Sequence, residues 1–598
     1  MGNVYGRLLK VDLTKESVET VSVDQEVVVN FVGGRGLGTR LIWDLVKPGT
    51  DPLSPDNVLM FLTGPITGLI GGGHTCVVFK SPETGTIGRA MTGGHWGAEL
   101  RFAGYDGLIV QGRAQRPTYI RIKDDEVLMM DARHLWGKGV TETERTIKSE
   151  LGDGLVRVLS CGPAGENLVR YASLIQESWR AAGRGGPGAV MGSKNLKAVA
   201  VRGTKGLCLH DTPTALKLVG DFTQRLLTTW SVHGRYAALR YGTMKDSIVA
   251  AQAGILAVKN QREGYWKEVS RTGGVRLERR NVIAHAACHG CPASDLHISL
   301  VRTGPYAGTV SQIDFDSSAT LGPNCLVKDI DGLMYVNALC DELGLDAEST
   351  GYVISWAMEC YEKGLLTQED LDGIKLEWGS VEAMISLILK IVKREGIGDL
   401  LAQGLKYAVQ RVGKGSDKFA MHAKGMGFGG WHAVVRERGL QYAVGDRGGC
   451  HHYGMSIEEQ NWRAWADSLT CCTWHQVAVG WDYIKLASAA TGLDFGGSRE
   501  EWDKTAERIL ILARAYNIRE GIQPLKEDVL PERIHTEPLS YGRLKGSVYP
   551  KEEFLRDRAQ WYQKRGCNEK GVPTPEHLRE LGLDFVIPEL KRIGAYDL

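Results

Sequence analysis

The sequence predicts an α+β protein in which a β-rich N-terminal domain precedes two mainly α-helical domains. Two observations predict this fold class. Residues 1–209 carry short β-like runs separated by glycine, whereas from about residue 210 apolar residues recur at i, i+3 and i+4 spacing. A basic, glycine-containing stretch over 412–416 interrupts the helical part. We therefore expect three domains, over 1–209, 210–415 and 416–598.

The expected strands and helices follow this division. The clearest β-like runs are Val58–Leu62, Thr75–Phe79, Gly107–Val110 and Lys197–Val201. Helical periodicity is clearest over Val327–Leu345, Ala383–Val412 and Lys504–Ile522.

The composition gives no indication of a strongly charged partner. Of the 598 residues 43% are hydrophobic and 24% are charged, and the net charge is +1, so neither nucleic acid nor an anionic membrane is an expected partner. The longest apolar run, Val58–Ile70, is broken by Gly64, Pro65 and Gly68, and no membrane-spanning helix is expected. Met1–Tyr5 lacks the features of a secretory signal, so the 12 cysteines are expected to be reduced thiols in the cytoplasm, some of them metal ligands.

Cysteines from two distant segments form a possible metal-ligand set. Cys288 and Cys291 make a C-x-x-C pair in a region expected to be helical, and Asp295 follows where a third thiolate would stand. Cys472 lies far downstream, next to Cys471. Thiolates gathered in this way suit an iron–sulfur cluster. From residue types alone, a zinc site, a redox dithiol and buried core cysteines stay open as alternatives.

Two glycine runs place an arginine beside bare backbone amides. Gly33–Gly38 follows an apolar stretch, and Gly183–Gly188 is a literal G-x-G-x-x-G. A nicotinamide site is disfavoured, because Pro187 interrupts the second run and no long helix has room to follow it. The pattern suits a phosphate-bearing organic cofactor, although simple tight turns are preferred for Gly33–Gly38 alone.

Acidic and histidine side chains supply candidates for proton transfer. Asp314 and Asp316 lie on one side of a segment expected to be extended, and His451 and His452 follow a glycine pair. A carboxylate and an imidazole make a usable general acid–base pair. From residue types alone, a solvated aspartate pair and a surface histidine pair are the favoured interpretation.

Several blocks in the same order resemble the tungsten-containing aldehyde:ferredoxin oxidoreductase family nearly end to end. The most specific block is Arg180–Gly203, which contains the second glycine run. The other blocks are Phe31–Gly38, Asp51–Asn57, Leu62–Pro65, Gly93–Asp106 and Gly566–Pro573.

The resemblance implies a tungsten (or molybdenum) bis-pterin cofactor with magnesium, buried between the β-rich base and the helical domains, and a nearby [4Fe–4S] cluster. In this family two D-x-x-G-L-D and D-x-x-G-L-C segments each hold one pterin. The segment 341–346 matches the first fully, whereas 467–472 has Thr470 and Cys471 in place of glycine and leucine. The cofactor-binding residues implied by the resemblance are Gly93, Gly94, Ala182, Gly183, Arg184, Gly185, Asp341, Gly344, Leu345, Asp346, Asp467 and Cys471.

The resemblance also implies cluster ligands and a catalytic pair. Asp295 stands where the family has its third cluster cysteine, and Cys472 is chosen over Cys471 as the last ligand. The family's active-site glutamate aligns with Asp316, which is one methylene shorter, and the matching histidine is His451. The implied metal ligands are Cys288, Cys291, Asp295 and Cys472.

The implied function is oxidation of aldehydes to carboxylic acids, with the reverse reaction also credible. Electrons would leave through the cluster to ferredoxin or an iron–sulfur subunit. Two alternatives stay open: the catalytic subunit of a low-potential aryl-CoA-type reductase on the same scaffold, and a non-catalytic electron-transfer or assembly subunit. Homo-oligomers and hetero-oligomers are both compatible with the sequence.

Overall fold

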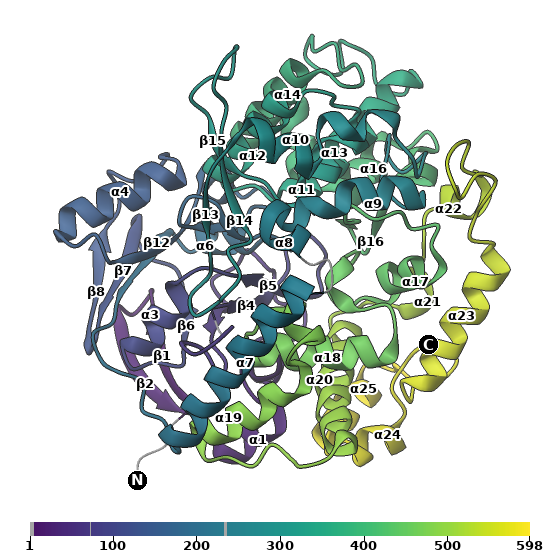
Figure 1. The fold of residues 1–598 in the computed structure, drawn as a ribbon. Coiled ribbons are helices and arrows are strands. Elements are labelled where there is room, and N and C mark those ends of the chain that lie inside the picture. The colour runs from purple at the N-terminus through teal and green to yellow at the C-terminus, as the bar shows by residue number, and fades with distance from the viewer. Residues whose placement is uncertain (1–4, 72, 233–235, 598) are drawn as a thin grey trace.

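The computed structural model describes residues 5–71, 73–232 and 236–597 (Figure 1). The segment 1–4, in which no secretory signal is expected, lies outside the described residues. The β-rich part and the helical parts lie side by side, and the C-terminal helices return to the N-terminal sheet, where α18 (Ile457–Leu469) and α20 (Arg499–Arg519) pack against α2 (Gly34–Leu45) (Figure 1). The first and last parts of the chain therefore share one hydrophobic core.

Two six-stranded sheets make up the β-rich part. The first has the order β2 (Ser17–Ser22), β1 (Arg7–Asp12), β6 (Gly107–Gln111), β3 (Leu59–Leu62), β4 (Thr75–Lys80) and β5 (Ile87–Thr92). The second has the order β11 (Arg180–Ala182), β10 (Leu174–Gln176), β9 (Arg157–Cys161), β12 (Leu196–Arg202), β7 (Thr118–Lys123) and β8 (Glu126–Asp131). Pairing is antiparallel except between β1 and β6 and between β12 and β7.

The central strands β3 and β4 are mainly apolar and both of their faces are covered, although β4 begins with Thr75 and ends with Lys80. Every residue of β3 and β4 is buried, which explains why these segments show no alternation of polar and apolar residues. The helices of the β-rich part are α1 (Gln25–Phe31), α2, α3 (Trp96–Phe102), α4 (Val140–Leu151), α5 (Pro163–Glu166) and α6 (Pro187–Ser193).

Helices dominate the rest of the chain. Those before residue 415 are α7 (Thr212–Val232), α8 (Tyr236–Tyr241), α9 (Asp246–Ala253), α10 (Gly274–Arg280), α11 (Phe315–Leu321), α12 (Ile330–Leu343), α13 (Ala347–Glu362), α14 (Val381–Lys393), α15 (Ile397–Ala402) and α16 (Leu405–Val412). Those after it are α17 (Arg436–Val444), α18, α19 (Tyr483–Thr491), α20, α21 (Pro524–Glu527), α22 (Glu532–Thr536), α23 (Lys551–Lys564), α24 (Pro575–Glu580) and α25 (Ile587–Arg592).

Two small sheets interrupt these helices. One has the order β13 (Val282–Ala286), β14 (Leu296–Leu300) and β15 (Val310–Gln312), and the other pairs β16 (His422–Ala423) with β17 (Met426–Gly427). The C-x-x-C pair lies in the loop after β13, so the expectation that it sits in a helical region was wrong. The alternation of polar and apolar residues in the two strands beside the loop is short. The helical periodicity of the neighbouring segments therefore dominates the sequence pattern in this region.

The periodic stretch Ala383–Val412 is helical but not continuous. It divides into α14, α15 and α16, and the breaks fall at Gly396 and Gly404, whose φ angles of +56° and +89° lie in the left-handed region. Each glycine is the N-cap of the helix that follows it, α15 or α16, and glycine adopts such a φ angle at little steric cost.

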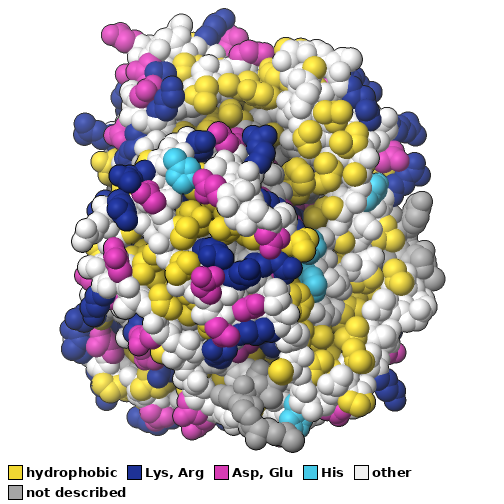
Figure 2. Space-filling model, turned by 90° about the vertical axis from the view of Figure 1, so that its left-hand side faces the viewer, with side chains coloured by type: hydrophobic (Ala, Val, Ile, Leu, Met, Phe, Trp, Pro, Cys, Tyr) yellow, Lys and Arg dark blue, Asp and Glu magenta, His cyan; other side chains and the backbone are white. Residues whose placement is uncertain are grey.

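The predicted fold class is confirmed: a β-rich N-terminal part is followed by helical parts. The domain boundaries at about 209 and 415 stay a prediction. Within the described part of the chain, no helix is long and apolar enough to cross a membrane. Acidic, basic and hydrophobic side chains are interspersed over the face in Figure 2, where a short band of Lys and Arg lies near a hollow.

Candidate active site

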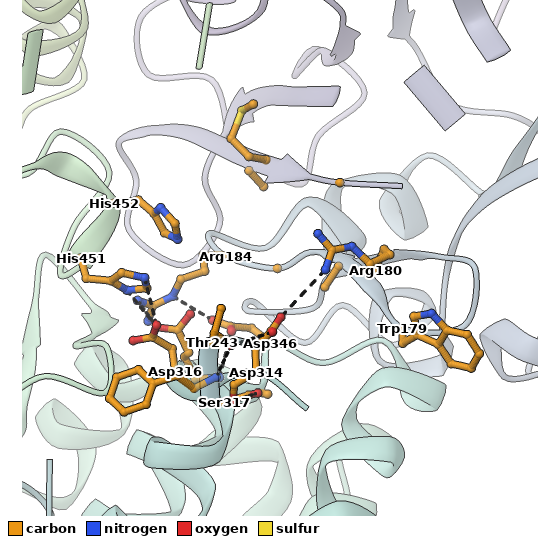
Figure 3. A pocket seen from close by; sticks show the side chains of 18 of the residues that line it. Trp179, Arg180, Arg184, Thr243, Asp314, Asp316, Ser317, Asp346, His451 and His452 are labelled. Carbon is orange, nitrogen blue, oxygen red and sulfur yellow. Dashed lines mark hydrogen bonds and ion pairs between the residues drawn. The ribbon is translucent and has the colours of Figure 1, made fainter. Parts of the chain in front are cut away.

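A cavity of about 430 Å³ lies between the β-rich part and the helical parts (Figure 3). Its wall is formed by residues from stretches far apart in the chain, within 74–93, 179–184, 243–246, 312–348 and 431–474. A large enclosed space built from several elements is the usual place for a ligand or cofactor.

The predicted catalytic pair comes together in this cavity. Asp316 lies in the first turn of α11, and His451 opens a short 3-10 helix over His451–Tyr453. His451 Nε2 and Asp316 Oδ2 are 3.2 Å apart, and the two side chains point toward each other in Figure 3. The amide of Gly430 donates to Asp316 Oδ1 at 2.8 Å and so fixes the carboxyl group.

Two interpretations drawn from residue types alone were wrong at this point. The segment is not extended through Asp316, because Asp314 is the N-cap of α11 and Phe315 begins the helix. Acidic residues are favourable at the start of a helix, where unpaired backbone amides concentrate positive charge. His451 is not a surface residue: its side chain is 13% exposed and lines the cavity, beside the ring of His452.

Burial sets the protonation of this pair. It raises the pKa of Asp316 to about 6 and lowers the pKa of His451 well below its ordinary value. The neighbouring guanidinium groups of Arg438 and Arg184 add to the effect on His451. A carboxyl group that titrates near neutrality beside a neutral imidazole is suited to exchanging protons with a reacting molecule.

The first predicted pterin signature links the helical part to the β-rich part. After α12 the chain turns at Gly344, whose φ is +74°, and Leu345 then pairs with Ala172. Asp346 is the N-cap of α13 and accepts a hydrogen bond from the amide of Glu348 at 3.0 Å. Of this signature, the residues that line the cavity are Asp341, Leu345 and Asp346.

Gly183 presents bare backbone to the cavity. A Cβ placed there would have Asp346 Oδ1 at 3.8 Å and Ala181 Cβ at 3.9 Å as its nearest neighbours, so the space in front of it is open. Gly186 differs, because its φ is +87° and a Cβ there would collide with the backbone oxygen of Arg170. Gly186 therefore serves the turn, whereas Gly183 leaves room for a ligand to approach the backbone.

Arginine side chains give the cavity positive charge. Arg184 lies 3.3 Å from Asp346 Oδ2 and 3.2 Å from Glu348 Oε2. Arg180, Arg447 and Arg463 also line the cavity, and the buried Nε of each has no hydrogen-bond partner among the described residues. Buried guanidinium N–H groups left without a partner are costly, and an anionic, phosphate-bearing ligand would satisfy them.

A second cavity, of about 50 Å³, brings the predicted metal ligands together. Cys288, Cys291, Asp295 and Cys472 all line it. Burial raises the pKa of Asp295 to about 6 and the pKa values of the three thiols above their ordinary range. Three thiols and a carboxyl group around one small space are a donor set that could hold an iron–sulfur cluster.

The two cavities share a wall. His74, Arg180 and Trp474 line both of them. Arg180 Nη2 donates to Cys288 Sγ at 3.6 Å, and Arg180 Nη1 is 3.9 Å from Asp314 Oδ2 on the side of the larger cavity (Figure 3). Gly93 has no room for a Cβ, because Arg180 and Cys288 lie against its backbone. A group in the larger cavity and a metal in the smaller one would therefore be near neighbours.

Other predicted cofactor residues lie near the cavity but outside its described wall. Asp467 is ion-paired with Arg89 at 2.7 Å and with Arg35 at 3.6 Å, and Gly185 donates its amide to Glu83 at 3.1 Å. The predicted cofactor residues outside the described wall are Gly94, Ala182, Gly185, Gly344, Asp467 and Cys471. Their role in cofactor binding stays a prediction.

Several residues of the wall were not singled out from the sequence. Arg447, Arg463, Trp431 and Glu348 lie in no motif with a fixed spacing, and only the fold brings them to the cavity. Arg180 alone carried a signal, because it begins the most specific of the sequence blocks.

Comparison with known proteins finds similarity over nearly the whole chain. The family profile described as "Aldehyde ferredoxin oxidoreductase, N-terminal domain" matches residues 8–203, and that described as "Aldehyde ferredoxin oxidoreductase, domains 2 & 3" matches 221–583. The tungsten-containing aldehyde ferredoxin oxidoreductase of Pyrococcus furiosus is 36% identical over 97% of this chain and 99% of its own length. The enzyme of the same name from Thermococcus kodakarensis is 35% identical over 97% of this chain and 99% of its own.

Two further matches are proteins whose names describe other functions. An aliphatic sulfonate oxidoreductase, WOR-like subunit, of Pyrococcus furiosus is 34% identical over 98% of both chains. Among solved structures, the active-site complex BamBC of benzoyl coenzyme A reductase in complex with 1,5-dienoyl-CoA has a TM-score of 0.84 and 26% identity, covering 100% of this chain and 99% of that one. Since both family profiles match in order and the similarity spans nearly the whole chain, this protein belongs to the aldehyde ferredoxin oxidoreductase family of oxidoreductases.

Proposed function

We propose that the protein oxidises aldehydes to carboxylic acids at a tungsten bis-pterin cofactor in the larger cavity, and passes the electrons through an iron–sulfur cluster in the smaller one. The observation that carries this proposal is the shared wall between the two cavities, one holding an acid–base pair and the other three thiols with a carboxyl group. Tungsten is preferred to molybdenum because the relatives that match over nearly the whole chain are named tungsten-containing.

The residues present fit such a cofactor. Arg180, Arg447 and Arg463 offer buried N–H groups without partners to phosphate oxygens, and Gly183 leaves the backbone open to close approach. The backbone of Ala182 and Gly183 would also accommodate the magnesium ion that is proposed to accompany those phosphates. When bound, the cofactor supplies the two-electron redox chemistry, and the protein supplies position, charge and exclusion of bulk water.

The acid–base pair accounts for the protons of the reaction. An aldehyde and water yield a carboxylic acid, two electrons and two protons, so the site has to take up protons as the electrons leave. Asp316 and His451, 3.2 Å apart, hold and pass these protons. Phe315 and Trp431 line the same cavity with ring centroids 4.7 Å apart, and they provide apolar contact for the carbon skeleton of the substrate.

The smaller cavity provides the exit for electrons. Cys288, Cys291, Cys472 and Asp295 would hold a [4Fe–4S] cluster, with the carboxylate as the harder fourth ligand. Ferredoxin or an iron–sulfur subunit is the proposed acceptor. None of the 12 cysteines forms a disulfide, which supports a reducing compartment such as the cytoplasm.

A second candidate function has one observation in its favour. The match to the benzoyl coenzyme A reductase complex extends over the whole chain, so an aryl-CoA thioester is the alternative substrate class. Asp316 in place of the family glutamate also alters the reach of the acid into the pocket.

One assay separates the two functions. Anaerobically purified protein is supplied with aliphatic and aromatic aldehydes, or with aryl-CoA thioesters and a low-potential donor, while dye reduction or oxidation is followed. We expect aldehyde-dependent dye reduction and formation of the acid. Turnover of the thioester without turnover of any aldehyde would replace the proposal with the second candidate.

A further inference from the structure

Glu348 lies at the centre of the active site although no motif includes it. It occupies the first turn of α13, two residues after the predicted pterin residue Asp346, and it lines the larger cavity. Its side chain is 15% exposed, and its Oε2 atom forms an ion pair with Arg184 Nη1 at 3.2 Å but no hydrogen bond with the described residues. A buried carboxyl oxygen without a hydrogen bond requires an explanation.

The imidazole of His451 stands between two carboxyl groups. Its Nε2 is 3.2 Å from Asp316 Oδ2, and its Nδ1 is 3.7 Å from Glu348 Oε2. One ligand atom from each of these three residues lies within 4.8 Å of the others. Gly429 makes this crowding possible, because a Cβ there would come within 2.7 Å of His451 Nδ1 and 3.0 Å of Asp316 Oδ1.

The local charge favours a proton over a metal ion as the cation that these groups share. Arg184 Nη1 lies 3.2 Å from Glu348 Oε2 and already brings one positive charge to the cluster. A divalent ion would face the repulsion of this buried guanidinium. The groups that face Glu348 are Arg184, Asp316, Asp346, Cys450 and His451.

We propose that Glu348 supports the acid–base pair as a positioning residue. It acts through His451, because its Oε2 atom accepts the proton that His451 carries on Nδ1. A proton released by the substrate passes from Asp316 Oδ2 to His451 Nε2, while the proton on Nδ1 moves to Glu348 Oε2. One N–H bond forms as the other breaks, so the imidazole stays neutral and one proton has crossed it. The site then stores both protons of a turnover, one on each carboxyl group, and this inference rests on the proposed aldehyde oxidation.

The electrostatics agree with that role. Burial raises the pKa of Glu348 well above its ordinary value, so its carboxylate is a stronger base than that of an exposed glutamate. Burial lowers the pKa of His451, so the ring conducts protons without retaining a positive charge. Reorientation of the Glu348 side chain by a few tenths of an ångström would bring its oxygen within hydrogen-bond distance of Nδ1.

The first test compares E348Q with the wild-type enzyme and with E369Q, a control at an exposed glutamate outside the site. E348Q keeps the shape of the side chain but cannot accept a proton. We expect kcat to fall by roughly tenfold to a hundredfold while KM changes by less than about threefold, and the pH profile to keep only the ionisation of Asp316 near pH 6. E348D should restore part of the rate and the wild-type shape of the profile.

Two results would overturn the proposal. One is an E348Q profile that superimposes on that of the wild type and E369Q. The other is a loss of tungsten, pterin or iron in E348Q that accounts for the whole fall in rate, which would show a structural role instead.

A second readout does not depend on turnover. Infrared difference spectra between acid and neutral pH should show protonated carboxyl bands, because Asp316 and Asp295 also titrate near pH 6, and one of these bands should disappear in E348Q and persist in E369Q. Persistence of every band in E348Q would refute the inference. Wild-type protein with full tungsten content but no activity on aldehydes would contradict the proposed function, and the infrared result would still decide whether Glu348 holds the proton.

Discussion

Changing either of two glycines in one motif to alanine should alter the stability of the protein in opposite directions. At Gly183 the new Cβ meets nothing closer than 3.8 Å, and the φ angle lies outside the left-handed region. Alanine there restricts the unfolded chain, so G183A should stabilise the cofactor-free protein by about 0.4–1 kcal/mol. The same methyl group would project into the space where the cofactor approaches the backbone, so the tungsten and pterin content should fall by tenfold or more.

Gly186 provides the matched contrast. Its φ of +87° costs an alanine about 1–2 kcal/mol. The Cβ would also collide with the Arg170 carbonyl, and moving that backbone adds roughly 1–3 kcal/mol. G186A should therefore be destabilised by about 2–5 kcal/mol.

The assay has two arms for each variant. Urea unfolding of cofactor-free protein gives the change in stability, and elemental analysis with pterin fluorescence gives the cofactor content of protein purified from cells. A wild-type content of tungsten and pterin in G183A would show that the open space at Gly183 does not belong to the cofactor. Destabilisation of G183A as large as that of G186A would also contradict the reasoning.

Three further changes test separate parts of the account. D316N should lower kcat/KM by about 10²–10⁴-fold, and D316E should stay within about tenfold of the wild type; a fully active D316N would exclude Asp316 from proton transfer. D295A should lose iron to a chelator faster than the wild type and D295C more slowly, and equal rates in all three proteins would show that Asp295 is not a ligand. Burial alone would raise the pKa of Asp446, but the guanidinium groups of Arg89 and Arg35 lower this pKa below its ordinary 3.8. The ionised Asp446 carboxylate therefore stabilises the folded protein above that pH, and this stabilisation is lost as the pH falls through the lower pKa of the folded state. D446N should thus cost about 3–5 kcal/mol at neutral pH in urea unfolding, and a cost below about 1 kcal/mol would contradict the importance of this buried ion pair.

Local patterns in the sequence predicted the strands that are almost wholly buried and the helices whose apolar residues recur with the helical period. The apolar runs of β3, β4, β6 and β12 and the periodic helices α12 and α20 stand where the sequence places them. The failures have physical causes. α11 was missed because an aspartate at the N-cap looks the same in sequence as one in an extended segment, and Ala383–Val412 was not divided because its periodicity persists across two glycine breaks.

The residues of the candidate site also fall into those that local sequence patterns indicate and those that only folding brings together. Cys288, Cys291 and Asp341, which lie within motifs and were proposed from the sequence, line the two cavities, and their role stays a prediction. Contacts such as that of Arg180 with Cys288, which are 108 residues apart, exist only after folding. Glu348 shows the limit most clearly, since its partners Arg184 and His451 come from other segments and nothing in its neighbours along the chain indicates them.

We propose that the two adjoining cavities hold a tungsten cofactor and an iron–sulfur cluster. The most direct measurement is the tungsten, molybdenum and iron content per chain of anaerobically purified protein. The account predicts about one tungsten and roughly four irons per chain, with little molybdenum. Protein purified under strictly anaerobic conditions that contains neither tungsten nor molybdenum, or that contains tungsten without iron, would contradict it.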